Sequence, residues 1–193
     1  MELRGAGVLV LVEGAARVSV AVEAERRLGG LGLEVLVPEL SAEALEADRP
    51  ALRELERALG ELERRPGIDR ARLAAVGFGR GGTLAFLLGC ARRLAAVVDV
   101  DGPVLYPELS SAQPIQPLEL GLNLEGAFLG VFAGREPRVT DEELGLLRDR
   151  LEAAARPHEI VVLDDACTAQ SDAIASEEVW NLLADFLVES LGA

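Results

Sequence analysis

The segment that decides the fold is LAAVGFGRGGTLAF, residues 73–86. Its first six residues suit a buried strand, the glycines that follow favour a sharp turn, and the run from Thr83 suits a buried helix. A strand that turns directly into a helix in this way has the geometry of a nucleophile elbow. Gly79 occupies the apex, and Gly77 and Gly81 lie two positions to either side, where so tight a turn leaves no space for side chains.

Apolar runs and amphipathic segments alternate outward from this turn, which predicts a parallel sheet covered by helices on both faces. The predicted strands are residues 7–12, 33–37, 73–78, 94–100, 127–133 and 159–163. The predicted helices include residues 48–65, 141–154 and 176–191, the second of which begins with a capping box at Thr140. Trp180 is expected at the margin of the last helix.

The size and composition suit one globular domain over residues 1–193. The chain has 193 residues, of which 50% are hydrophobic and 27% charged, so it can bury one well-filled core. No internal repeat or linker is visible. Its two cysteines, Cys90 and Cys167, have neither a close-spaced partner nor a histidine cluster. This pattern predicts neither a disulfide framework nor structural zinc.

The charge balance excludes some partners. All 19 basic residues are arginine, and 33 acidic residues give a net charge of −14. Such a chain repels nucleic acid and anionic lipid. No apolar run is long enough to cross a bilayer and no secretory leader is evident, so we expect a cytoplasmic protein. The sequence alone leaves the oligomeric state open.

One long stretch, residues 101–126, contains four prolines, at positions 103, 107, 114 and 117. Prolines this close together prevent a regular helix or a central strand. Long loops in compact domains often cover a site, so we expect this stretch to lie over the carboxyl edge of the sheet. A surface loop without function is the alternative.

The elbow resembles that of the dienelactone hydrolase family, Gly-x-Cys-x-Gly-Gly, and further segments extend the resemblance over nearly the whole chain. These segments are residues 9–14, with Glu13 after the first core strand, residues 37–40, residues 134–139, and residues 165–168. The resemblance implies an α/β-hydrolase fold: a three-layer α/β/α sandwich without a separate cap. It also implies that Gly79, Glu136 and Thr168 occupy the triad positions of nucleophile, acid and base.

Two of these three positions depart from the family. Gly79 has no side chain, and Thr168 cannot accept and return a proton near neutral pH as histidine can. Only the acid, Glu136, is kept. Loss of the nucleophile or the base removes most of the rate of a triad, leaving roughly 10³ to 10⁴ over water. We therefore expect a degenerate, non-catalytic relative that binds a small ligand or a protein partner; the alternative is a weak or atypical ester or lactone hydrolase.

No other residue is placed to rescue the reaction. Cys90 lies eleven positions beyond Gly79 on the following helix, roughly 16 Å along its axis. His158 begins a strand, roughly 17 Å from the carboxyl edge, and is expected at the sheet boundary with access to water. Cys167 neighbours the base position, but no histidine or lysine is available to activate its thiol.

The remaining cleft is expected to be acidic. The carboxyl edge should gather several carboxylates around one cation, Arg80; they are Glu13, Glu39, Asp101, Glu136 and Asp164 or Asp165. Arg80 either pairs with one of these carboxylates or holds a small anion beside free helix amides. Asp99 and Asp101 are a weak candidate for a metal site, and we expect neither metal nor cofactor. The candidate ligand-binding residues are Glu13, Gly79, Arg80, Glu136, Cys167 and Thr168.

The same glycines also satisfy a dinucleotide fingerprint, Gly77-x-Gly79-x-x-Gly82. It follows a strand and opens a helix, and the next strand carries Asp99 and Asp101 at about the distance where an acid meets a ribose. However, this fingerprint normally lies in the first βαβ unit, and two strands and two helices are expected to precede it here. Dinucleotide binding therefore stays as a second alternative.

Overall fold

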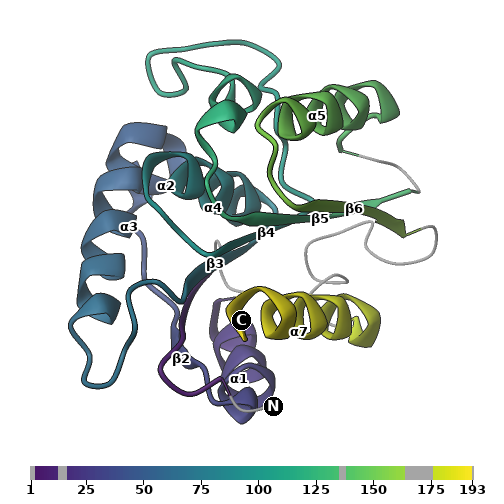
Figure 1. The fold of residues 1–193 in the computed structure, drawn as a ribbon. Helices are drawn as coiled ribbons and strands as arrows, with labels where there is room; N and C mark the ends of the chain where they lie inside the picture. The colour runs from purple at the N-terminus through teal and green to yellow at the C-terminus, as the bar shows by residue number, and fades with distance from the viewer. Residues whose placement is uncertain (1–2, 13–16, 135–137, 164–175, 193) are drawn as a thin grey trace.

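Six parallel strands form one sheet in the order β2-β1-β3-β4-β5-β6 (Figure 1). The structure is a computed structural model, and it describes residues 3–12, 17–134, 138–163 and 176–192. The strands are β1 (Gly7–Leu11), β2 (Glu34–Leu36), β3 (Leu73–Phe78), β4 (Ala96–Val100), β5 (Ala127–Ala133) and β6 (His158–Leu163). The four strands β1, β3, β4 and β5 are apolar along almost their whole length because both faces of the sheet are covered.

Helices cover both faces, which gives the three-layer α/β sandwich that was predicted (Figure 1). Helices α1 (Arg17–Arg27) and α7 (Glu177–Leu191) pack on one face. Helices α3 (Asp48–Glu63), α4 (Arg80–Ala91) and α5 (Asp141–Ala153) pack on the other. Shorter elements are α2 (Ala42–Glu46) and the 3₁₀ segments η2 (Gly29–Leu31) and η3 (Pro117–Asn123). Each face therefore has its own buried apolar cluster.

The predicted elements are confirmed, with ends that differ by one or two residues. The predicted capping box at the start of α5 is present: the Thr140 hydroxyl accepts from the Glu143 amide, and the Glu143 carboxylate accepts from the Thr140 amide. In α7 the Ser176 hydroxyl accepts from the Val179 amide, so Ser176 is the cap and not the first helical residue. The proline-rich stretch contains no α-helix, but it does contain η3, in which Pro117 takes the first turn.

Trp180 was expected at the margin of α7, but it is buried in the core. Its side chain is 1% exposed, and its ring lies 5.4 Å from that of Phe78, centroid to centroid. Phe78 is the last residue of β3, immediately before the elbow. Periodicity placed Trp180 at the edge of the apolar stripe of α7 and could not show that Phe78 would reach it from the sheet.

None of the helices within the described ranges is both long and apolar enough to cross a lipid bilayer.

Replacing Trp180 by alanine should lower the free energy of unfolding by about 3–5 kcal/mol, because it leaves a large cavity beside Phe78. Trp180 is the only tryptophan, so chemical denaturation of this variant is followed by circular dichroism. The control is Val22→Ala on α1, where Val22 is 65% exposed, and it should change stability by no more than about 0.5 kcal/mol. Equal effects of the two substitutions would contradict the burial of Trp180.

Candidate functional site

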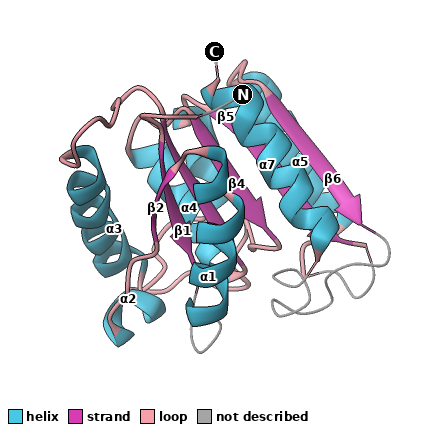
Figure 2. Ribbon diagram, turned by 90° about the horizontal axis from the view of Figure 1, so that it is seen from below, coloured by secondary structure: helices cyan, strands magenta, loops and turns pink. Residues whose placement is uncertain are grey.

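The topology itself marks one place at the carboxyl edge of the sheet. The chain goes from β1 to β2 on one side and then crosses back to β3 on the other side of β1. Ligands in open parallel sheets bind where the strand order reverses in this way. Residue Gly79 follows β3 directly, so the elbow lies at this point. The strands and their connections at this edge can be followed in Figure 2.

Gly79 has the backbone conformation of an elbow apex. Its φ of 57° and ψ of −126° are accessible to glycine and strained for other residues. The turn is held from both sides: the Gly79 amide donates to the Val100 carbonyl at 2.8 Å, and its carbonyl accepts from the Gly82 amide at 2.8 Å. The elbow is therefore formed without a side chain at its apex.

The neighbouring glycines allow the backbones to approach closely, as predicted. A Cβ at Gly77 would overlap the Gly81 carbonyl, and a Cβ at Gly81 would overlap the Leu11 carbonyl of β1. A Cβ at Gly82 would overlap the carboxylate of Asp99. Close packing of the elbow, including its contacts with β1 and β4, thus explains why all three positions are glycine.

Arg80 makes an ion pair, but with a partner that was not predicted. Its guanidinium donates to the Asp48 carboxylate at 2.5 Å and to the Tyr106 hydroxyl at 2.6 Å. The Tyr106 hydroxyl in turn donates to the same Asp48 oxygen at 2.9 Å. Asp48 was not among the carboxylates expected to pair with Arg80, because it comes from the first turn of α3 and not from a strand end. We call Arg80, Asp48 and Tyr106 the polar triangle.

The polar triangle lies almost entirely out of water. The side chains of Arg80 and Asp48 are 11% and 8% exposed, and Tyr106 is 6% exposed. Burial lowers the pKa of Arg80, but its bonds to Asp48 and Tyr106 outweigh this effect and raise the pKa above its usual value. Burial also raises the pKa of Tyr106. Arg80 therefore stays protonated and the Tyr106 hydroxyl stays neutral at neutral pH.

Tyr106 is the residue of this region that sequence reasoning missed. It belongs to the proline-rich stretch, and Gln116 from the same stretch binds its amide and its carbonyl at 2.6 and 3.0 Å. The Asp48 amide also donates to the carbonyl of Ala112, at 2.9 Å. The stretch therefore packs against the elbow and the start of α3. The one feature of the sequence that could have drawn attention to Tyr106 is that it is the only tyrosine in the chain.

Asp99 in β4 and Asp101 directly after this strand are both buried. Asp99 is fully buried, and one of its oxygens accepts from the Gly102 amide at 2.8 Å. Its other oxygen has no hydrogen-bond partner among the described residues, and burial raises the pKa of this carboxyl well above its usual value. A carboxyl buried in this way is not available to a ribose hydroxyl.

Asp101 is 4% exposed and has a positive φ of 56°, which is uncommon for a residue other than glycine. Burial raises its pKa, while the Ala133 amide and the nearby Arg138 lower it. The Arg138 guanidinium lies 3.7 Å from the Asp101 carboxylate. The sequence had suggested that Arg80 is the one cation at this edge of the sheet. Arg138 is a second cation there.

The predicted carboxylates are not gathered around Arg80 in the described part of the chain. Glu39 is exposed and forms an ion pair with Arg17 at 3.5 Å. Several predicted positions lie outside the described residues: Glu13, Glu136, Asp164, Asp165, Cys167 and Thr168. Their roles therefore remain predictions.

Neither Cys90 nor His158 belongs to this site. Cys90 lies near the end of α4, and burial raises the pKa of its thiol to about 12. His158 is the first residue of β6, at the amino end of the sheet, and one ring nitrogen lies 2.9 Å from the Arg156 carbonyl. No group of three or more His, Cys, Asp or Glu side chains able to hold a metal ion occurs among the described residues.

Comparison with known proteins agrees with this geometry. The model of the dienelactone hydrolase family matches residues 37–191, which include the elbow and most of the sheet. The chain belongs to the dienelactone hydrolase family. This membership confirms the family and the fold class that the sequence indicated.

A curated relative covers a shorter region. The chain is 32% identical over 103 residues to a protein of Salmonella typhi named "Putative carboxymethylenebutenolidase". The match spans 53% of this chain and 38% of that protein. The chain therefore matches well under two thirds of this relative's length.

Solved structures share the fold at low identity. The "Putative Dienelactone Hydrolase" of Klebsiella pneumoniae has a TM-score of 0.81 and 22% identity, over 98% of this chain and 87% of that one. The dienelactone hydrolase-like promiscuous phosphotriesterase P91, from metagenomic libraries, has a TM-score of 0.78 and 21% identity, over 97% and 87%. At these identities the structures support the α/β fold.

Gly81→Ala should destabilise the protein by about 3 kcal/mol, because its methyl group would overlap the Leu11 carbonyl. The control is Gly145→Ala in α5, where nothing lies within 4 Å of the added atom. This variant should gain about 0.5–1 kcal/mol from helix propensity. Urea denaturation measures both, and a neutral effect of Gly81→Ala would refute the close approach of α4 to β1.

The Asp99→Asn variant should lose less stability than the native chain as the pH rises. The folded pKa of Asp99 is raised, so from pH about 4 upward the folded state keeps a proton that the unfolded state has released. This group therefore makes the native protein less stable as pH rises towards the folded pKa. Urea midpoints at pH 5 and pH 8 should differ less for Asp99→Asn than for the native chain.

The control for this pH experiment is Asp149→Asn, which removes a carboxylate from the exposed face of α5. It should keep the native pH dependence. If Asp99→Asn and Asp149→Asn show the same dependence, Asp99 does not carry the effect.

Proposed function

We propose that this member of the dienelactone hydrolase family does not hydrolyse esters and instead binds a small ligand at the carboxyl ends of β1 and β3. One observation carries the proposal. Gly79 has the strained conformation of an elbow apex, with φ of 57° and ψ of −126°, but has no atom that can attack a carbonyl carbon. An elbow is useful to a hydrolase because it presents a nucleophile, so its retention without one favours a role in binding.

Neither neighbour of Gly79 in the chain offers a replacement nucleophile. The side chains nearest the elbow in the chain are Phe78, which packs on Trp180, and Arg80, which is held by Asp48 and Tyr106. Arginine cannot act as a general base because it stays protonated. Thr168 at the expected base position adds a second argument from the sequence.

A weak or atypical ester or lactone hydrolase is the second candidate. Family membership favours it, and an oxyanion can be stabilised by elbow amides even without a triad. A water molecule would then have to attack directly. The two candidates therefore differ in whether turnover occurs.

A fluorophosphonate probe and p-nitrophenyl acetate distinguish them. The native chain should show no mass increase with either reagent by intact mass spectrometry, and ester cleavage should not exceed that of an equal mass of inert protein. The variant Gly79→Cys/Thr168→His, which restores both residue types of the family, should acquire an acetyl group. Saturable turnover by the native chain, or an acyl adduct on it, would overturn the proposal.

Ligand binding is measured separately by thermal melting with small carboxylates and phosphates. A ligand present at 100 times its Kd should stabilise the folded state by about 2.7 kcal/mol. Adding NAD(H), NADP(H) or FAD to the same series tests the dinucleotide alternative, which predicts a clear rise in Tm. If no compound raises the Tm, the remaining form of the binding hypothesis is that the site binds a protein partner.

A further inference from the structure

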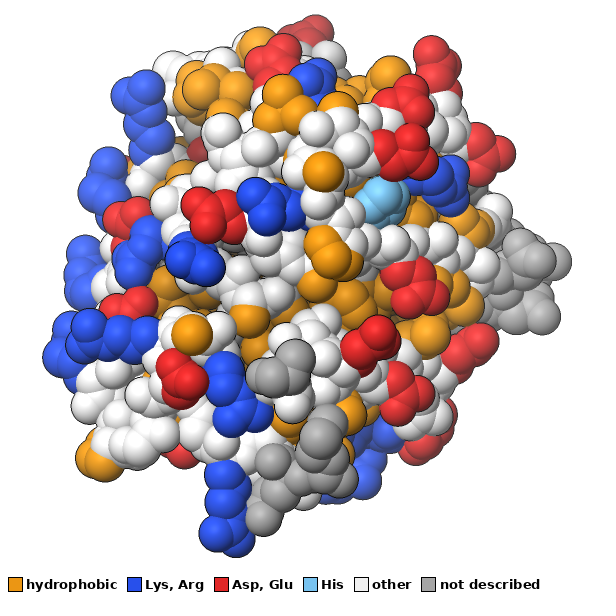
Figure 3. All heavy atoms as spheres, in the orientation of Figure 1, with side chains coloured by type: hydrophobic (Ala, Val, Ile, Leu, Met, Phe, Trp, Pro, Cys, Tyr) orange, Lys and Arg blue, Asp and Glu red, His pale blue; other side chains and the backbone are white. Residues whose placement is uncertain are grey.

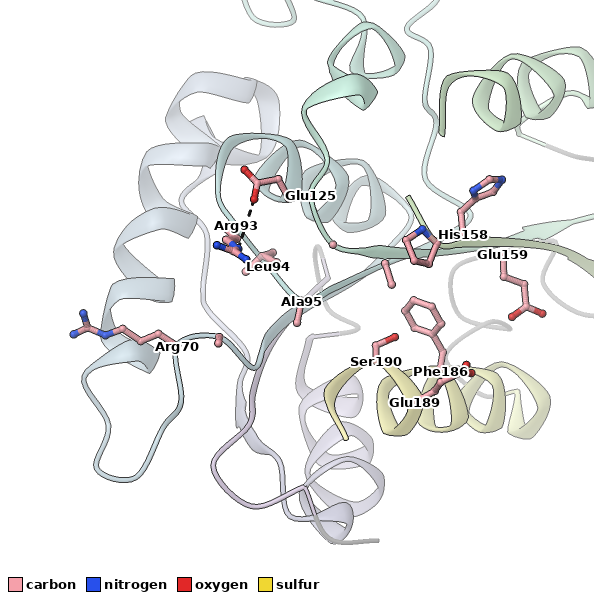
Figure 4. Close-up of a pocket in the computed structure, with 14 residues that line it drawn as sticks. Arg70, Arg93, Leu94, Ala95, Glu125, His158, Glu159, Phe186, Glu189 and Ser190 are labelled. Carbon is pink, nitrogen blue, oxygen red and sulfur yellow. Dashed lines mark ion pairs between the residues drawn. The ribbon is translucent and has the colours of Figure 1, made fainter. Parts of the chain in front are cut away.

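A groove of about 610 Å³ lies at the opposite edge of the sheet from the elbow. Its walls come from the amino ends of β4, β5 and β6 and from the last turns of α7 (Figure 4). We call it the amino-edge groove. It lies apart from the site described above, because parallel strands place their amino ends at one edge and their carboxyl ends at the other. The amino-edge groove is therefore independent of the proposed function.

Apolar groups form part of the lining. Phe186 of α7 points towards the sheet between α7 and β6 in Figure 4. It is only partly buried, although it packs against the core on its inner side. Ala127 and Pro157 line the groove on the strand side. A partly exposed aromatic ring beside small apolar groups can hold the flat, apolar part of a small molecule.

The charges beside Phe186 are negative. Glu159 of β6 and Glu189 of α7 line the groove, and neither forms an ion pair within the described portion of the chain. In Figure 4 the Glu159 carboxylate points from the sheet towards α7. Acidic side chains are also prominent on this side of the molecule in Figure 3.

The arginines of the groove do not neutralise these two carboxylates. Arg93 forms an ion pair with Glu125 at 3.5 Å. Arg70 lies on the far side, and its guanidinium points away from Phe186 in Figure 4. The end of the groove that contains Phe186 is thus complementary to a positive charge, in a chain whose net charge is −14.

A metal ion is a poor match for this charge. Hard cations require several oxygen ligands, and no cluster of three or more acidic, His or Cys side chains suited to a metal is found within the described ranges. An organic ammonium group needs fewer contacts and is attracted both by carboxylates and by the face of an aromatic ring. We propose that the amino-edge groove binds a small organic cation, an amine that carries an aromatic ring, between Phe186 and the carboxylates of Glu159 and Glu189.

Three compounds with the same ring and different charge test this proposal. Phenethylamine is cationic at pH 7, 2-phenylethanol is neutral and 3-phenylpropionate is anionic. Each is titrated into the ¹⁵N-labelled full chain while two-dimensional amide spectra are recorded. Saturable shifts should occur at Ala127, Phe186 and Ser190 but not at Gly79 to Gly82. Affinity should fall from the cation to the alcohol to the carboxylate.

The variant Glu159→Gln/Glu189→Gln should weaken phenethylamine binding about fivefold and leave 2-phenylethanol binding unchanged. Phe186→Leu should weaken the binding of both compounds. The matched control, Glu56→Gln/Glu152→Gln, removes two negative charges from exposed positions on α3 and α5 and should bind phenethylamine like the native chain. The amide spectra report at the same time that each variant is folded.

Three results would overturn the proposal. The first is the absence of saturable shifts at the amino-edge groove. The second is binding of the carboxylate as tightly as the amine. The third is an equal loss of amine affinity in the groove variant and the matched control, which would mean that only overall charge is being measured.

Discussion

The close approach of α4 to the centre of the sheet is the constraint on which the rest of this structure depends. It is possible because Gly77 and Gly81 lack a Cβ where the backbones of β1, β3 and α4 meet. This contact places the first turn of α4 directly above the strand ends. It also fixes Gly79 in a conformation that other residues rarely adopt. The position of Arg80, and with it the polar triangle, follows from the same contact.

This constraint explains how an elbow can be formed with glycine at its apex. Gly77 and Gly81 are required for the packing of the sheet against α4, because a Cβ at either position would overlap backbone atoms. The apex requires the positive φ of Gly79, which glycine adopts without strain. Chemistry and architecture are therefore separable at this turn, because its packing does not depend on an apex side chain.

The fold could be predicted from the sequence to within a residue or two at most strand and helix ends, because apolar periodicity and capping residues are local signals. The elbow glycines could be predicted for the same reason. The partner of Arg80 could not, because Asp48 is 32 positions away and its place at the start of a predicted helix gives no sign of a contact with the elbow. Tyr106 was missed because a proline-rich stretch has no periodicity from which to infer where a side chain points. Trp180 was misplaced because its burial depends on Phe78, a residue of a different element.

The polar triangle has a mechanical consequence. It joins three segments that are distant in the chain, namely the start of α3, the first residue of α4 and the proline-rich stretch. Separating α3 from α4 would leave the Arg80 guanidinium and the Asp48 carboxylate without a counter-ion, at a cost that increases with burial. Separating the proline-rich stretch would remove the hydrogen bonds of Tyr106 to both charged groups. These segments are therefore expected to behave as one rigid body at the rim of the sheet, so that a molecule arriving there meets a preformed wall.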